Sequence, residues 1–148
     1  MRKVIQILMV SFSLLAVGAA AAGAELHDLI ETGQSQAASG RLDDALATFT
    51  TAAQTYPDSS LAHTRLGGVR VLRQEYSRGI EEFQQAIMLD QANANAFIGL
   101  AVAYLHLGQH AHAKAALKEA EKLDVGKGEQ IRKLLAWIDT RSNSRRVH

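Results

Sequence analysis

The sequence contains no cysteine, one proline and few aromatic residues. Without cysteine it has no thiol nucleophile and no disulfide, so packing alone must stabilise the folded chain. Because Pro57 is the only proline, most of the chain can be helical without interruption. The H-E-x-x-H, G-x-S-x-G and phosphate-loop motifs are also absent. These absences argue against an enzyme and allow a largely helical protein.

The charges of the chain are nearly balanced. Its 148 residues include 16 Lys and Arg against 15 Asp and Glu, and 47% of the residues are hydrophobic. A chain of this size and composition is expected to form one globular domain. The balance gives no electrostatic reason to expect nucleic acid or an anionic membrane as a partner. A local basic strip, Lys114, Lys118 and Lys122, is expected to be solvated surface.

The N-terminus has the pattern of a targeting segment. Arg2 and Lys3 precede an apolar run that ends at Val17, and only Gly and Ala follow up to Ala24. This order predicts a signal peptide over residues 1–24, so the chain is expected to be exported to the periplasm, without membrane insertion after cleavage. The alternative is an uncleaved anchor that faces the periplasm, because the apolar segment is long enough to span a bilayer.

Residue types recur along the chain with a period of 34 residues. In each copy a small residue is followed four positions later by a large apolar residue, and three positions after that by an alanine. The three sets are Ala45, Phe49 and Ala52, then Gly79, Phe83 and Ala86, then Ala113, Leu117 and Ala120. This spacing places each set on one side of a helix. Small residues there let a second helix approach closely, while Phe and Leu fill the space between the two.

A second set of positions marks the other half of each unit. Gly33, Gly67 and Ala101 recur as small residues, and the turn between the two helices carries Gly40, Gln74 and Gly108. In the second unit, helices are expected from about Ser59 to Leu72 and from about Tyr76 to Leu89. The turn at Gln74 is expected to be less well specified, because glycine adopts unusual turn conformations at little steric cost.

These positions resemble the tetratricopeptide repeat pattern, W-x2-L-G-x2-Y followed by A-x3-F-x2-A and a proline, over residues 26–127. Pro57 occupies the proline position of the first unit, whereas Gln91 and Val125 replace it in the other two. The resemblance implies an all-α fold, a right-handed superhelical stack of three helix-turn-helix repeats. The repeats are expected at residues 26–59, 60–93 and 94–127, within a domain that covers residues 25–140.

The residues that follow the third repeat are expected to form a capping helix over residues 128–140. A terminal repeat otherwise exposes the apolar face that a neighbour covers elsewhere, so a helix with one polar face is needed there. Its apolar stripe consists of Ile131, Leu134, Leu135 and Ile138, with Trp137 alongside. The tail, residues 141–148, is expected to be flexible.

The resemblance also indicates where a partner would bind. In this family the first helix of each pair lines the concave side of the stack, where extended peptides or partner helices dock. The corresponding residues, expected to form a partner-binding groove, are Ile30, Gln34, Leu61, Arg65, Val71, Leu72, Ile98, Val102 and Leu105. Such a groove would bury an apolar segment of another protein, with Arg65 as a carboxylate partner. The alternative for each of these side chains is packing against neighbouring helices.

One variant of the fold grips C-terminal carboxylates with a clamp of lysine and asparagine residues. Ile30 and Gln34 occupy the clamp positions of the first repeat, and Asn95 and Gly99 occupy those of the third. The basic clamp is therefore missing, which disfavours a role as a cochaperone of cytosolic chaperones.

Three histidines gather near the turn of the third repeat. His106, His110 and His112 could bind zinc or copper, but no carboxylate lies in this segment, and alternate residues of a helix point apart. His110 also stands where Leu42 and Tyr76 occur in the other repeats, so a packing role competes. No metal site and no cofactor is therefore expected.

Together these features predict a non-enzymatic protein–protein interaction scaffold or adaptor of the bacterial cell envelope, which binds a partner segment in its concave groove. One alternative is a structural scaffold that forms homo-oligomers by stacking its repeats between subunits. Another is a periplasmic metal-binding protein. The identity of the partner does not follow from the sequence, because repeat folds host many functions.

Overall fold

The computed structural model describes residues 22–144, which form helices joined by short turns. A first helix covers residues 22–38 of the described chain. It is followed by α2 (Leu42–Thr55), α3 (Ser60–Leu72), α4 (Tyr76–Leu89), α5 (Ala94–His106), α6 (His110–Leu123), the short 3-10 helix η1 (Val125–Lys127) and α7 (Gly128–Ser144). Residues 22–144 contain no strand, so the predicted all-α fold is confirmed. Both helices expected in the second unit are found at the expected places.

The predicted signal peptide lies almost entirely outside the described residues, which begin at residue 22. Residues 22–24, its last three positions, belong to the first described helix. Among residues 22–144, none of the helices combines the length and the apolar character that crossing a bilayer requires.

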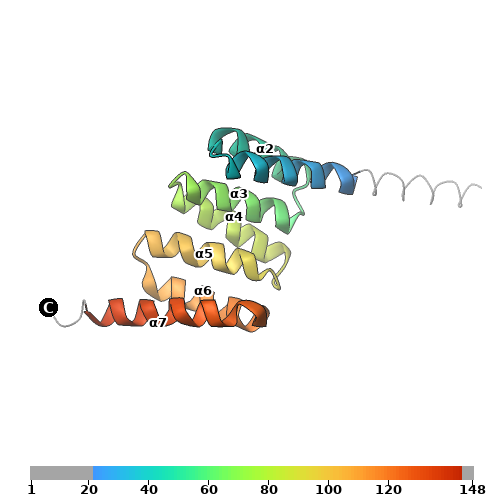
Figure 1. Cartoon of the computed structure of the whole chain (residues 1–148). Helices are drawn as coiled ribbons and strands as arrows, with labels where there is room; N and C mark the ends of the chain where they lie inside the picture. Colours follow the sequence, from blue (N-terminus) through green and yellow to red (C-terminus); the bar gives the residue numbers. More distant parts are fainter. Residues whose placement is uncertain (1–21, 145–148) are drawn as a thin grey trace, which may run out of the picture.

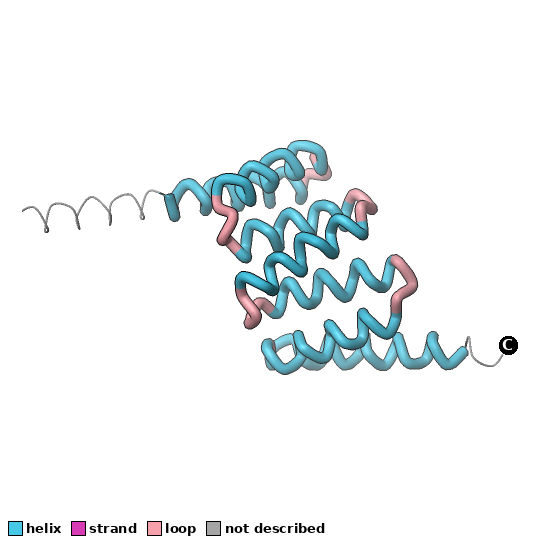
Figure 2. The backbone as a smooth tube through the Cα atoms, turned by 180° about the vertical axis from the view of Figure 1, so that it is seen from behind, coloured by secondary structure: helices cyan, strands magenta, loops and turns pink. Residues whose placement is uncertain are grey.

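The helices stack in two layers. In Figure 1 the layer of α3, α5 and α7 lies nearer the viewer, and the layer of α2, α4 and α6 faces the viewer in Figure 2. Helices α3 and α5 contact each other directly, whereas the described residues of α4 and α6 make no such contact. Because helices on the inner side of a curved stack lie closer together than those on its outer side, α3 and α5 line the concave side.

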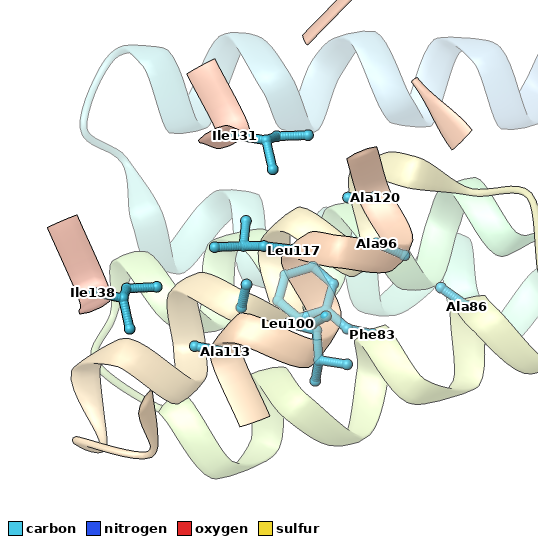
Figure 3. Packing of buried hydrophobic residues seen from close by; sticks show 11 residues of the cluster. Phe83, Ala86, Ala96, Leu100, Ala113, Leu117, Ala120, Ile131 and Ile138 are labelled. Carbon is cyan, nitrogen blue, oxygen red and sulfur yellow. The ribbon is translucent and has the colours of Figure 1, made fainter. Parts of the chain in front are cut away.

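The core is built around the large apolar residue of each repeat. Phe83 is 2% exposed, and its ring lies between the backbones of α3 and α5 (Figure 3). A Cβ atom at Gly67 would lie 2.9 Å from this ring, and one at Gly99 would lie 2.3 Å from it. Phe49 fits against Gly33 in the same way. The expectation that small residues permit close helix approach while Phe fills the gap is therefore confirmed.

Helix α7 covers the open end of the stack. Ile131 and Ile138 are buried and belong to the same cluster as Leu117 of α6 (Figure 3). The helix continues to Ser144, past the expected end at residue 140, so residues 141–144 are helical rather than part of a flexible tail. The physical reason is that no Gly or Pro occurs between residues 140 and 144 to stop it. Residues 145–148 lie outside the described part.

The three turns between paired helices share one backbone geometry. Gly40, Gln74 and Gly108 all have positive φ, of 76°, 65° and 71° respectively. At the second turn the N–H of Gln74 donates to the carbonyl oxygen of Val71 at 2.9 Å, and Gly108 donates to Leu105 at 3.0 Å. The expectation of a less well specified turn at Gln74 is therefore wrong. The packing of α3 on α4 imposes the left-handed conformation on glutamine at a steric cost.

Gln74→Gly is expected to raise the free energy of unfolding by about 0.5–1 kcal/mol. A left-handed conformation costs a residue with a Cβ atom roughly 1–2 kcal/mol, and part of the gain is lost to the greater freedom of glycine in the unfolded chain. Urea unfolding followed by circular dichroism measures the change. The reciprocal variant Gly108→Gln should lose a similar amount, and an unchanged or lower stability of Gln74→Gly would contradict the strain.

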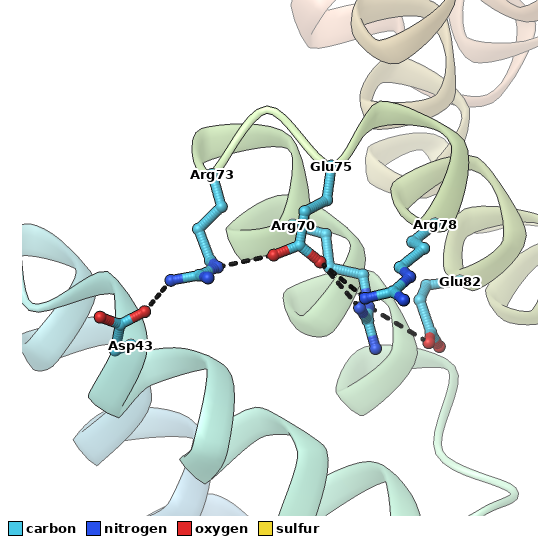
Figure 4. A network of polar contacts seen from close by, with 6 residues as sticks. All are labelled: Asp43, Arg70, Arg73, Glu75, Arg78 and Glu82. Atoms are coloured by element: carbon cyan, nitrogen blue, oxygen red, sulfur yellow. Dashed lines mark hydrogen bonds and ion pairs between the residues drawn. The ribbon is translucent and has the colours of Figure 1, made fainter.

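An ion-pair network ties the turn between α3 and α4 to its neighbours (Figure 4). Glu75 accepts hydrogen bonds from Arg73 Nε at 2.8 Å and from Arg70 Nη1 at 3.1 Å. Arg73 also pairs with Asp43 of α2, and Arg70 Nε lies 3.6 Å from Glu82 Oε1 of α4. The hydrogen bond from Arg73 and the further contact with Arg70 hold the pKa of Glu75 below its ordinary value.

Glu75→Gln is expected to destabilise the protein at neutral pH and to have little effect in acid. Because folding lowers the pKa of Glu75, the carboxylate stabilises the folded state above the ordinary carboxyl pKa, and this contribution is lost as the pH falls through the lowered value. Melting temperatures of the wild type and the variant should therefore differ at neutral pH and converge at an acidic pH below the lowered pKa of Glu75. A difference that is the same at both pH values would show that the charge of Glu75 is unimportant.

Candidate functional site

The concave layer contains an open cleft between α5 and α7. Val102, Leu105 and His106 of α5 line one wall, and Leu134 and Trp137 of α7 line the other. The cleft has a volume of about 470 Å³. In the described chain the backbones of α5 and α7 each lie close to that of α6 but not to each other, which leaves room for a cleft between them. Trp137, on the α7 wall, is 46% exposed.

Two of the predicted groove residues, Val102 and Leu105, lie in this cleft. The other three residues that line it were not among the groove residues expected from the sequence. The sequence pattern places His106 among the candidate metal-binding histidines, and Leu134 and Trp137 in the capping helix. A signal for Trp137 was present, because this large aromatic residue stands beside the apolar stripe of its helix rather than within it.

Three further predicted groove residues are exposed but do not line the cleft. Gln34 lies on the first helix, and Leu61 and Leu72 of α3 are 45% and 60% exposed. Leu61 and Leu72 stand near opposite ends of their helix, roughly 16 Å apart along its axis at 1.5 Å per residue. They are accessible to a partner but do not form one patch.

Ile30 does not form part of the groove surface. It is only 4% exposed and belongs to the core cluster that contains Phe49, so the packing alternative applies at this position. Val71 and Ile98 are partly buried and pack against the cluster around Phe83. The reason is that a helix in the inner layer packs both against its partner helix and against the next repeat. Only a narrow strip of its surface then faces the concave side, where a ligand could bind.

Arg65 is the predicted carboxylate partner, and its surroundings suit that role. Its side chain is half-buried on α3, and its Nε atom is buried without a hydrogen-bond partner. It makes no ion pair with any residue between positions 22 and 144. Because Nε is enclosed by the protein, a partner carboxylate would have to pair with the remaining nitrogens of the guanidinium group.

The packing also explains why the basic clamp is missing. At Gly99, a clamp position, any side chain would collide with the buried ring of Phe83. Asn95, the other clamp position of the third repeat, is bound by the ammonium group of Lys127, with Nζ 2.6 Å from Oδ1. The two clamp positions of α5, Asn95 and Gly99, therefore make contacts within the protein.

The three histidines face different neighbours. His106 stacks on Tyr76, with ring centroids 4.5 Å apart, and His112 lies tilted over Tyr104 at 5.1 Å. Both ring nitrogens of His110 are buried without a hydrogen-bond partner, as in a packing role. Nowhere in residues 22–144 do three or more His, Asp or Glu side chains gather in a way that could hold a metal ion.

Two overlapping segments of the chain, residues 30–96 and residues 70–138, match the tetratricopeptide repeat family. No curated protein matches the chain.

Several solved structures have the same fold. The type III secretion chaperone SycD of Yersinia enterocolitica, in complex with a peptide of the translocator YopD, superposes with a TM-score of 0.73 and 21% identity, over 79% of this chain and 94% of that one. The TPR2B domain of yeast Sti1 in its pHsp70 complex gives 0.74 and 16%, over 78% and 97%. The first TPR domain of human RPAP3 gives 0.76 and 17%, over 82% and 94%. At such identities the likeness shows the fold alone.

Proposed function

Because the chain belongs to the tetratricopeptide repeat family, we propose that it is a non-enzymatic scaffold that binds a segment of another protein on the concave side of its helix stack. The observation that carries this proposal is the apolar cleft between α5 and α7. Its walls contain Val102, Leu105 and Leu134, and the half-exposed Trp137 lies on the α7 wall. Aromatic side chains in such clefts commonly dominate the energy of protein binding.

The proposed partner segment is apolar and carries an acidic group. Apolar side chains of an extended or helical segment would fill the cleft, since segments of both kinds bind grooves through a few regularly spaced anchors. Its carboxylate would pair with the guanidinium group of Arg65, which makes no ion pair with a residue between positions 22 and 144. Two of the solved structures with this fold, SycD with a YopD peptide and Sti1 with pHsp70, are complexes, so the fold can hold segments of other proteins.

The proposed location is the periplasm of a bacterial envelope, and it rests on the sequence pattern of residues 1–24. N-terminal sequencing of the protein released by osmotic shock tests it. A chain that begins at Glu25 would support export with cleavage. Recovery of the intact N-terminus from the cytosol would contradict it.

Val102→Glu is expected to abolish partner binding without unfolding the protein. A photo-crosslinking residue at Trp137 first identifies the bound segment in cells, and the dissociation constant of that segment is then measured against the variant. Burying a glutamate against an apolar anchor should weaken binding at least about 30-fold, the effect of losing a 2 kcal/mol contact.

Met88→Glu is the matched control, because Met88 is 69% exposed on α4, in the other layer. It should leave the dissociation constant unchanged, and both variants should keep the helicity and melting temperature of the wild type. Equal binding by Val102→Glu would refute the proposed groove. If the crosslinked partner is a second copy, and light scattering shows a dimer that Val102→Glu dissociates, the homo-oligomeric alternative replaces the adaptor.

A further inference from the structure

At one position in the second helix, each of the three repeats carries a different residue type. This position faces the first helix of its own repeat, and the three occupants are Thr48, Glu82 and Ala116. In the first repeat the Thr48 hydroxyl donates to Gln36 Oε1 at 2.8 Å. In the second, Glu82 Oε2 lies 2.9 Å from His63 Nδ1, and Glu82 also pairs with Arg70. Polar contacts therefore occupy this position in the first two repeats.

In the third repeat the side chain at this position makes no polar contact. Ala116 has only a methyl group, and the residues equivalent to His63 and Arg70 are the aromatic Phe97 and Tyr104. Together with Leu100 and Ala115 they line a cleft between α5 and α6 with a volume of about 440 Å³. This volume falls within the range of small-molecule sites, which runs from about 300 to 1,000 Å³.

The rim of this cleft has an excess of positive charge. It is formed by Lys118, Lys122, Glu119 and His112. Lys122 Nζ lies 2.7 Å from Glu119 Oε1, so these two charges compensate each other. Lys118 has no ion-pair partner among the residues that the structure describes. The apolar floor and the uncompensated ammonium group together suit an apolar molecule that carries one negative charge.

This cleft is separate from the concave groove. At 100° per residue, Phe97, Leu100 and Tyr104 lie on one side of α5, and Val102 and Leu105 lie on another. The two clefts share no lining residue. Occupancy of one therefore leaves the other accessible.

We propose that the α5–α6 cleft binds a small amphipathic carboxylate, an aliphatic chain or aromatic ring that ends in one carboxylate group. Its apolar part lies over Ala116 between Phe97 and Tyr104, and its carboxylate pairs with Lys118. The lining offers one apolar floor and one ammonium group without an ion-pair partner, which matches a ligand with one apolar part and one carboxylate. The amino-acid differences between the three repeats make this site particular to the third one.

The test is a titration of the full chain with sodium octanoate, followed by ¹H–¹⁵N NMR. Saturable shifts are expected in amides of α5 and α6 that surround the cleft. Ala115→Leu should abolish them, because Ala115 is exposed and lines the cleft, so leucine there fills the space without entering the core. Ala111→Leu is the matched control, an exposed position one turn earlier on the same helix that does not line the cleft, and should bind octanoate normally.

Charge is tested separately. Lys118→Gln should weaken octanoate binding about two- to fivefold, as expected for an exposed ion pair, whereas Lys133→Gln, an exposed lysine of α7, should not. Octylammonium should bind more weakly than octanoate. Absence of saturable shifts, equal affinity for octylammonium, or unchanged binding by Ala115→Leu would each overturn the proposal. So would a site that binds an acidic apolar peptide but not octanoate.

Discussion

Phe83→Ala is expected to lower the free energy of unfolding by about 3–5 kcal/mol, as the loss of a large buried aromatic side chain does. The ring is 2% exposed and is enclosed by α3 at Gly67 and by α5 at Gly99. Its removal leaves a cavity at the junction of two repeats, and neither helix can fill that cavity without moving its own repeat. Chemical unfolding of the full chain, followed by circular dichroism, measures the loss.

Two controls separate this effect from a general sensitivity to substitution. Phe83→Leu keeps most of the buried volume and should cost about 1.5 kcal/mol or less. Leu72→Ala removes an apolar side chain that is 60% exposed and should stay within about 0.5 kcal/mol of the wild type. A melting temperature for Phe83→Ala within one degree of the wild type would show that the ring is not in the core.

Gly99→Ala should destabilise the protein by about 1–2 kcal/mol, although alanine is the better helix former. The added Cβ would lie 2.3 Å from the Phe83 ring, which cannot move freely because it is buried. Overpacking of this kind costs about 1–3 kcal/mol, and the gain of about 1 kcal/mol in helix propensity offsets part of it. The free energy of unfolding in urea gives the net effect.

Gly68→Ala provides the matched control. Gly68 also lies in the middle of a helix, but a Cβ atom there would meet nothing within 4 Å, so this variant should be stabilised by about 1 kcal/mol. In the Phe83→Ala background the collision at Gly99 disappears, and Gly99→Ala should then stabilise the protein as well. If Gly99→Ala has the same effect in both backgrounds, the ring and the glycine are not in contact.

The helices and their pairing could be predicted from the sequence because both depend on residues close together along the chain. Ala45, Gly79 and Ala113 recur at one period, and helix packing requires small residues at such positions. The same reasoning failed at Gln74. Side-chain preference alone suggested a looser turn, but the packing of α3 on α4 holds the backbone at a φ of 65°.

The candidate site was only partly predictable. Val102 and Leu105 were identified from their place in the repeat, but Ile30, which was predicted for the same groove, is buried, and its equivalent Ile98 is partly buried. The difference arises from the neighbours that each helix meets in space, and a repeat pattern does not specify these. Trp137 was seen as part of the cap, and its position opposite Leu105 depends on how α7 sits on α6.

The amino-acid sequence by itself determined that this chain is a stack of paired helices, because the periodic spacing of small and large residues encodes which helix faces must meet. Only the tertiary structure decided where that stack leaves open space. A cleft exists where two helices pack on a third while their own backbones stay apart, as those of α5 and α7 do on α6, or where alanine replaces a larger residue opposite aromatic rings. Both conditions depend on distances between segments that are remote along the chain.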